Sequence, residues 1–208
     1  MARLSVIPCR DANIRVGILG GSFNPAHTGH CHISLEAIKR LHLSYVVWLV
    51  SPQNPLKALN IKASLDQRVT FAKSVACSRK IIVSDIERHF PDCYTANSIA
   101  RIMEMHPKTE FMWIMGADNM LQIHKWYRWW RIFELLPVVV FDRGEHIQNL
   151  RNSKAGAMYS ASSIISGSNA YSNDDAGAAK HTDWYFLKIK KEYSSSSQLR
   201  SVLQCETK

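Results

Sequence analysis

The chain has 208 residues, of which 46% are hydrophobic and 21% are charged. A chain of this length and balance buries a full core, which excludes a disordered protein, a collagen-like repeat and a disulfide scaffold. Lysine and arginine outnumber aspartate and glutamate by 26 to 17, a net charge of +9. This charge favours a polyanionic partner, whether nucleic acid, an acidic membrane or a phosphorylated small molecule. The basic residues are dispersed along the chain, which weakens the nucleic-acid interpretation.

The cysteines and the apolar runs indicate a reduced, cytoplasmic protein. There are five cysteines, an odd number, and none are spaced as Cys-x-x-Cys. The longest apolar runs have the length of a strand, far below the ~20 residues of a membrane span. Residues 1–13 lack the apolar segment of a secretory signal and are expected to be a short leader. We expect residues 1–208 to form one domain that does not associate with a membrane. The protein is expected to be a monomer or a homo-oligomer.

Strand-like runs alternate with helical periodicity through nearly the whole chain. Strands are predicted over 15–19, 45–50, 80–84, 111–115, 137–142 and 184–189. Helices are predicted over 29–43, 66–78, 95–105 and 117–136, with a short one in the tail 194–203. Residues 152–180 are rich in Ser, Ala, Gly and Asn and are predicted to form a long loop or insertion.

This alternation predicts the α/β class: a Rossmann-like, doubly wound, mainly parallel sheet with helices on both faces. Such sheets bind ligands outside the carboxyl ends of their strands, at the point where the strand order reverses. The loop that leaves the first predicted strand is therefore the first place to look for a site.

That loop and the start of the next helix read GGSFNPAHTGH, residues 20–30. Gly20 and Gly21 are expected to permit a tight turn and the approach of a phosphate to backbone N–H groups. His27 and His30 are three residues apart at a predicted helix start, so they would share one face at a terminus that attracts anions. On these residues alone, the glycines could form only a turn, and the histidines could be incidental or could be metal ligands.

The whole string resembles the signature that follows the first strand in the nucleotidylyltransferase superfamily. Later segments resemble those of one of its families, the nicotinate-nucleotide adenylyltransferases, over roughly residues 14–204. These segments are SPQNPLK (51–57), CYTANSI (93–99), MGADNM (115–120), HKWYRWW (124–130), VVVFDRGE (138–145) and SSSSQLR (194–200). The chain departs from the family pattern at Asn24, His124-Lys125, Glu145, Ser194 and Ser197, and none of these changes removes a group that the chemistry needs.

The resemblance implies transfer of the adenylyl group of ATP to nicotinate mononucleotide in NAD biosynthesis. The products would be nicotinate adenine dinucleotide and pyrophosphate, formed by direct in-line attack on the α-phosphorus. Catalysis would then depend on positioning and charge stabilisation, without a covalent intermediate. Mg²⁺ would act as the cofactor on the triphosphate, and no protein metal ligands are expected because this ion leans on phosphate oxygens and water.

The resemblance also implies three groups of site residues. The catalytic residues would be His27, His30 and Arg200. ATP and its phosphates would be bound by Gly20, Gly21, Ser22, Phe23, Lys57, Gly116, Asp118, Arg143, Ser196 and Ser197. Nicotinate mononucleotide would be bound by Tyr94, Thr95 and Trp126, with the indole stacked on the pyridine ring.

The residues themselves support some of these roles and leave alternatives for others. Thr95 is expected to cap a helix whose backbone N–H groups then favour a carboxylate over an amide. Asp118 could accept from ribose hydroxyls or cap a helix, and Trp126 could be one core aromatic among four. Lys57 could be a solvated loop lysine, and the serines of the tail could be helix caps.

Two other functions remain open. Another adenylyl- or cytidylyltransferase of the superfamily, such as a phosphopantetheine adenylyltransferase, would share the first motif but not the Tyr94-Thr95 and Trp126 segments. A basic protein that binds RNA or DNA is allowed by the charge and the six tryptophans. The tryptophans fall mostly in predicted strands and helices, where packing in the core is the rule.

Overall fold

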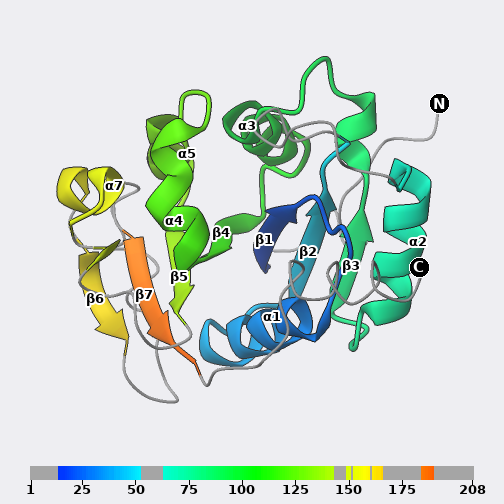
Figure 1. The fold of residues 1–208 in the computed structure, drawn as a ribbon, viewed down its shortest axis with the longest axis horizontal. Coiled ribbons are helices and arrows are strands. Elements are labelled where there is room, and N and C mark those ends of the chain that lie inside the picture. Colours follow the sequence, from blue (N-terminus) through cyan, green and yellow to red (C-terminus); the bar gives the residue numbers. More distant parts are fainter. Residues whose placement is uncertain are drawn as a thin grey trace, which may run out of the picture.

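The computed structural model describes residues 14–52, 63–142, 149–150, 152–159, 161–165 and 184–189. Over these residues seven strands form one sheet in the order β3-β2-β1-β4-β5-β7-β6, and each neighbouring pair is parallel (Figure 1). The strands are β1 (Arg15–Gly21), β2 (Tyr45–Val50), β3 (Ile81–Ser84), β4 (Glu110–Gly116), β5 (Val138–Asp142), β6 (Ala161–Ile165) and β7 (Trp184–Lys188). The predicted parallel α/β sheet is confirmed.

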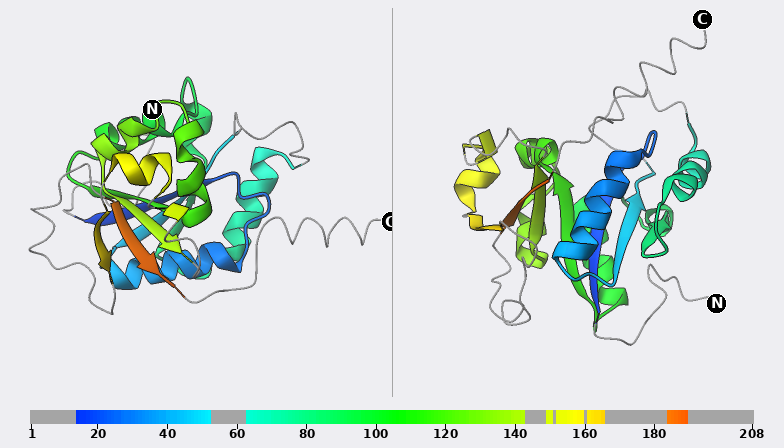
Figure 2. Two further views of the ribbon diagram at one scale, coloured as in Figure 1. Left: turned by 60° about the vertical axis from the view of Figure 1, so that its left-hand side comes forward. Right: turned by 90° about the horizontal axis from the view of Figure 1, so that it is seen from below.

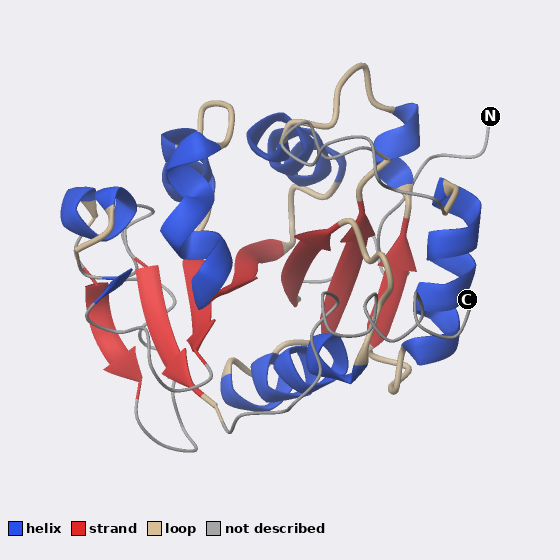
Figure 3. Cartoon of the chain, in the orientation of Figure 1, coloured by secondary structure: helices blue, strands red, loops and turns tan. Residues whose placement is uncertain are grey.

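Helices lie on both faces of the sheet (Figure 2). In Figure 3 they are the blue coils on either side of the red arrows. They are α1 (Thr28–Arg40), α2 (Leu65–Val75), α3 (Thr95–Met105), α4 (Ala117–Gln122), α5 (Trp130–Leu135) and α7 (Lys154–Met158), with 3-10 turns η1 (Ile86–His89) and η2 (Ile123–Lys125). Because strand side chains alternate in direction, β1 contributes to two cores. Val16 and Ile18 join the core under α3, α4 and α5, whereas Leu19 joins the core under α1 and α2. The sheet is therefore doubly wound, as predicted.

Two glycines of β1 make room for side chains of β4. A Cβ on Gly17 would lie 2.3 Å from Cδ1 of Ile114, and a Cβ on Gly20 would lie 2.3 Å from the ring of Trp113. The expectation that Gly20 and Gly21 form a tight turn is wrong, because both belong to the extended strand β1. The left-handed backbone conformation falls instead on Phe23, whose φ is 45°.

The predicted helix over 117–136 is broken into α4, η2 and α5. Residues 126–129 form a turn, and Arg128 within it has a φ of 47°. An α-helix requires negative φ at every residue, so the helical periodicity of the flanking segments cannot continue through this residue.

The segment 152–180, expected to be a loop, contains α7 and β6 in its first part. β6 pairs with β7, from Ala161 opposite Trp184 to Ile165 opposite Leu187. This pairing with a distant strand overrides the weak local preference of a serine-rich segment. The predicted leader 1–13 and the predicted tail helix 194–203 lie outside the described residues. Within the part that the structure describes, no helix combines the length and the apolar character needed to cross a membrane.

Candidate active site

The parallel sheet gathers several of the sequence motifs at one edge. The loop after β1, the first residues after β2, the segment between η1 and α3, and the start of α4 all follow carboxyl ends of neighbouring strands. β1 and β4 are adjacent at the centre of the sheet, and α1 and α4 leave them toward opposite faces. This is the switch point at which doubly wound sheets bind their ligands.

Two histidines cap the helix that begins at this point. His27 is the N-cap of α1, and its Nδ1 accepts a hydrogen bond from the N–H of Gly29 at 3.1 Å. The N–H of His27 donates to Nδ1 of His30 at 3.2 Å, which makes a reciprocal capping box from two imidazoles whose centroids lie 3.9 Å apart. Because each Nδ1 accepts from the backbone, each neutral ring carries its proton on Nε2. The pair is therefore a set of two Nε2–H donors at a helix N-terminus.

The ring and the backbone of His30 are both held from the core. The ring of Phe23 is buried, with its centroid 4.7 Å from that of His30 and 5.2 Å from that of Trp48. Nε1 of Trp48 donates to Oγ of Ser34 at 2.8 Å, and that hydroxyl donates to the carbonyl oxygen of His30 at 2.8 Å. The structure thus places the side chain of Phe23, which the sequence assigned to ATP, against the histidine as a support.

The start of α3 differs from the expectation in one respect. Thr95 is the first helical residue and Tyr94 occupies the N-cap position, so the predicted cap by Thr95 is wrong. No side chain of the described residues caps this helix. Asp92 binds beside its start, where Oδ1 accepts from the N–H of Tyr94 and from Nδ2 of Asn97, both at 3.1 Å. Its Oδ2 pairs with Arg101 at 2.9 Å, and this guanidinium is the main cause of the lowered pKa of the Asp92 carboxyl.

Aromatic side chains connect the start of α3 to the turn that follows η2. The ring of Tyr94 is exposed and lies 4.4 Å, centroid to centroid, from that of Tyr127. Trp126 is half-buried and meets the ring of Trp113 edge-on, with centroids 6.4 Å apart. The structure therefore brings the predicted Tyr94-Thr95 and Trp126 segments together, and it leaves part of the Trp126 indole accessible.

At the end of β4, a glycine leaves room for a carboxylate. Gly116 is the N-cap of α4, and a Cβ on it would lie 2.6 Å from Oδ1 of Asp118. Asp118 is exposed and makes no cap hydrogen bond, so the alternative that it caps the helix is wrong. Its carboxylate is therefore presented at the carboxyl edge of β4.

The sequence analysis missed two charged side chains that are buried at the same edge. Arg68 lies on the face of α2 that also buries Val69 and Ala72, and a charge within an apolar stripe was the available signal. Glu87 lies in η1, a turn with no periodicity that could have indicated it. Burial raises the pKa of the Glu87 carboxyl, and the hydroxyls of Ser98 and Ser51 oppose this shift only in part.

The buried Glu87 predicts a stability that falls as the pH rises. Because its pKa is raised in the folded protein, the folded state retains a proton that the unfolded chain releases from about pH 4.5 upward. The free energy of unfolding should therefore decrease as the pH rises from there through the raised pKa. Glu87→Gln should remove this decrease. Urea unfolding of both proteins between pH 4 and 8 measures it, and parallel curves would contradict the expectation.

Five of the predicted site residues lie outside the described residues: Lys57, Arg143, Ser196, Ser197 and Arg200. The others are distributed along the edge, with Ser22 directly after β1 and Gly116 at the end of β4. The described site thus consists of an imidazole pair on one side of the switch point and the start of α3 with its aromatic neighbours on the other.

Known proteins share both the sequence and the fold. The cytidylyltransferase-like family model matches residues 18–201. A relative from Cereibacter sphaeroides, described as "Probable nicotinate-nucleotide adenylyltransferase", is 39% identical over 187 residues, covering 90% of this chain and 97% of that protein. A protein of the same description from Roseobacter denitrificans is 39% identical over 187 residues, covering 89% of this chain and 91% of its own.

Among solved structures, Plasmodium falciparum nicotinic acid mononucleotide adenylyltransferase complexed with NaAD has the same fold. The TM-score is 0.63 at 19% identity, covering 91% of this chain and 84% of that one. The family match and the identity over nine-tenths of the chain lead to one conclusion: this protein belongs to the cytidylyltransferase-like family and, within it, to the nicotinate-nucleotide adenylyltransferases.

Proposed function

We propose that the chain transfers the adenylyl group of ATP to nicotinate mononucleotide in NAD biosynthesis. A phosphate oxygen of the mononucleotide attacks the α-phosphorus of ATP, the bond from this phosphorus to the bridging oxygen of the β-phosphate breaks, and pyrophosphate leaves with the electron pair. The observation that carries the proposal is the imidazole pair that caps α1 at the switch point. Membership of the family supports it.

On the ATP side, His27 and His30 donate from Nε2 to the phosphate oxygens on which charge develops. Positioned donors at a helix N-terminus stabilise such charge without reorganising during the reaction. The backbone of residues 20–23 lies beside them, and Gly116 with Asp118 takes the ribose of adenosine. Lys57, Arg143, Ser196, Ser197 and Arg200 complete this side of the proposal on the strength of the family motifs.

On the acceptor side, the first turn of α3 holds the nicotinate carboxylate and Trp126 stacks on the pyridine ring. Backbone N–H groups of a helix start carry partial positive charge, which suits an anion. Asp92 lies close to this turn, and its ion pair with Arg101 reduces the repulsion that it would otherwise exert on a second carboxylate. The arrangement favours the acid over the amide.

The divalent ion enters as part of the MgATP substrate. Within the described ranges, no group of three or more His, Cys, Asp or Glu side chains could hold a metal ion. An ion that is held mainly by phosphate oxygens and water needs no such group. When bound, the ion neutralises charge on the triphosphate and on the departing pyrophosphate.

The same proposal places the reaction in the cytoplasm, with ATP and nicotinate mononucleotide as the partners. The thiols of Cys31, Cys77 and Cys93 support a reducing compartment. The nucleic-acid alternative is not favoured, because the sequence has six tryptophans and four of them, Trp48, Trp113, Trp129 and Trp184, are buried and so provide no surface on which bases could stack.

Turnover with three acceptors tests the proposal and its pocket. With MgATP, we expect pyrophosphate release with nicotinate mononucleotide at a kcat/KM about 10- to 100-fold above that with nicotinamide mononucleotide, the worth of one charge-assisted hydrogen bond. Phosphopantetheine should give no turnover. Product chromatography identifies the dinucleotide. Equal rates with both mononucleotides would overturn the acceptor pocket, and turnover with phosphopantetheine alone would overturn the proposed reaction.

A further inference from the structure

Arg68 is a buried cation at the edge of the sheet where the site lies. It is the fourth residue of α2, and only 3% of its surface is exposed. Arginine is rarely this buried unless its donors are paired. Burial lowers the pKa of the guanidinium, because the charged form is less stable away from water.

The guanidinium of Arg68 bonds to three backbone carbonyls from two separate loops. Nη1 donates to the carbonyl oxygen of Ser22 at 2.6 Å and to that of Ser51 at 2.8 Å, and Nη2 donates to that of Pro52 at 2.8 Å. Ser22 is the first residue after β1, and Ser51 and Pro52 are the first two after β2. One side chain therefore joins the chain at the ends of two neighbouring strands.

Both joined segments lead directly into the proposed ATP side of the site. Ser22 precedes Phe23, whose left-handed backbone turns its ring against His30. In the sequence, Ser51 and Pro52 open the motif 51–57, which the family resemblance assigns to ATP. Because a planar guanidinium presents its donors in a fixed fork, its three bonds set the distance between these two segments as well as attracting them.

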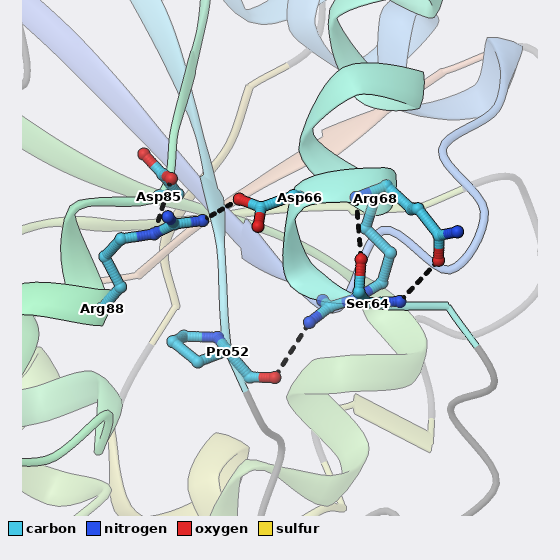
Figure 4. Close-up of polar contacts among 7 residues, drawn as sticks. Pro52, Ser64, Asp66, Arg68, Asp85 and Arg88 are labelled. Carbon is cyan, nitrogen blue, oxygen red and sulfur yellow. Dashed lines mark hydrogen bonds and ion pairs between the residues drawn. The ribbon is translucent and has the colours of Figure 1, made fainter.

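The helix that carries Arg68 is itself fixed at its start. Ser64 and Gln67 form a capping box at the N-terminus of α2. Asp66 pairs with Arg88, which also binds Asp85 at 2.8 Å. Figure 4 shows these contacts together with the bond from Arg68 to Pro52. The first turn of α2 is thus an anchored base from which Arg68 reaches both loops.

We propose that Arg68 is a positioning residue for ATP: its guanidinium holds the loop after β1 and the segment after β2 at the spacing that the triphosphate requires. The inference rests on the proposed function. It does not place Arg68 in contact with substrate: Nη1 and Nη2 are engaged with the carbonyls of Ser22, Ser51 and Pro52, and Nε is buried without a hydrogen-bond partner among the described residues.

Three variants separate positioning from stability. Arg68→Lys keeps the charge and loses the fork, Arg68→Met removes both, and Lys73→Met is the matched control, because it removes an exposed cation in the last turn of the same helix. In Arg68→Lys we expect kcat/KM for MgATP to fall about 10- to 100-fold, since a misplacement near 1 Å has effects of this size. KM for nicotinate mononucleotide should stay within about twofold of wild type, and Lys73→Met should behave as wild type in all constants.

Thermal unfolding provides the second readout. We expect lysine to recover much of the stability that methionine loses but little of the kcat/KM for MgATP. The proposal is overturned if folded Arg68→Lys keeps wild-type constants for MgATP, or if both variants lose only stability while KM for MgATP is unchanged. Binding of radiolabelled ATP to wild type and Arg68→Lys is measured separately without an acceptor. Absent turnover by wild type would count against the reaction alone, whereas equal ATP binding by both proteins would count against Arg68.

Discussion

Replacing His30 with alanine should lower kcat by about 10²- to 10³-fold, the usual effect of removing one positioned donor from a developing charge. The helix loses one capping contact as well, because Nδ1 of His30 accepts from the N–H of His27. Removing a helix cap destabilises a protein by about 1 kcal/mol, which leaves a domain of this size folded. Steady-state turnover with MgATP and nicotinate mononucleotide measures the first effect, and urea unfolding measures the second.

Two further variants assign the loss to the Nε2–H donor. His30→Gln places glutamine at the third position of α1, where its side chain completes a capping box, so stability should return while kcat recovers only in part. His42→Gly changes an exposed histidine just beyond the other end of α1, at a φ of 51° that glycine adopts readily, and should leave kcat unchanged. Near-normal turnover of His30→Ala would remove this residue from the mechanism.

Truncating Phe23 should have the largest effect on stability and a second effect on catalysis. Its side chain is 2% exposed and packs between Trp48 and His30, so Phe23→Ala should lower the free energy of unfolding by about 3–5 kcal/mol. The alanine keeps a side chain at a φ of 45°, so no backbone strain is relieved to offset the cavity. The ring of His30 also loses its contact with Phe23. Because this contact helps to hold the imidazole in place, kcat of the folded fraction should fall.

Phe71 provides the matched control for Phe23. It lies on α2 with 48% of its surface exposed, and Phe71→Ala should change the free energy of unfolding by about 0.5 kcal/mol or less. Urea unfolding with active-site titration separates loss of folded protein from loss of rate. If Phe23→Ala and Phe71→Ala had the same free energy of unfolding, the packing of Phe23 against Trp48 and His30 would not contribute to stability.

The strands could be predicted well where burial alone decides the structure. The run YVVWLV over residues 45–50 forms β2 with the expected bounds, because a central parallel strand is buried on both faces and reads as continuous apolar residues. β6 could not be predicted, because its pairing with β7 depends on a segment about twenty residues away. The break at Arg128 was equally hidden, since its neighbours all satisfy helical periodicity.

The site shows the same division between local and distant causes. His27 and His30 could be found from the string GGSFNPAHTGH, since their capping box involves only residues 27–30. The bonds of Arg68 could not, because Ser22 lies 46 positions away in sequence and becomes a neighbour only when β1 and β2 pair. The predicted cap at Thr95 was wrong because α3 begins at this residue, with Tyr94 at the N-cap position and no side-chain cap from the described residues.

The position of β1 at the centre of the sheet has a consequence for synthesis on the ribosome. One edge of β1 pairs with β2, which follows within 30 residues, but the other pairs with β4, where Arg15 stands opposite Glu110. Until residues 110–116 emerge, the nascent chain carries an apolar strand with an open edge, and such edges recruit other chains. The N-terminal half, which contains His27 and His30, therefore completes its folding only after β4 has been synthesised.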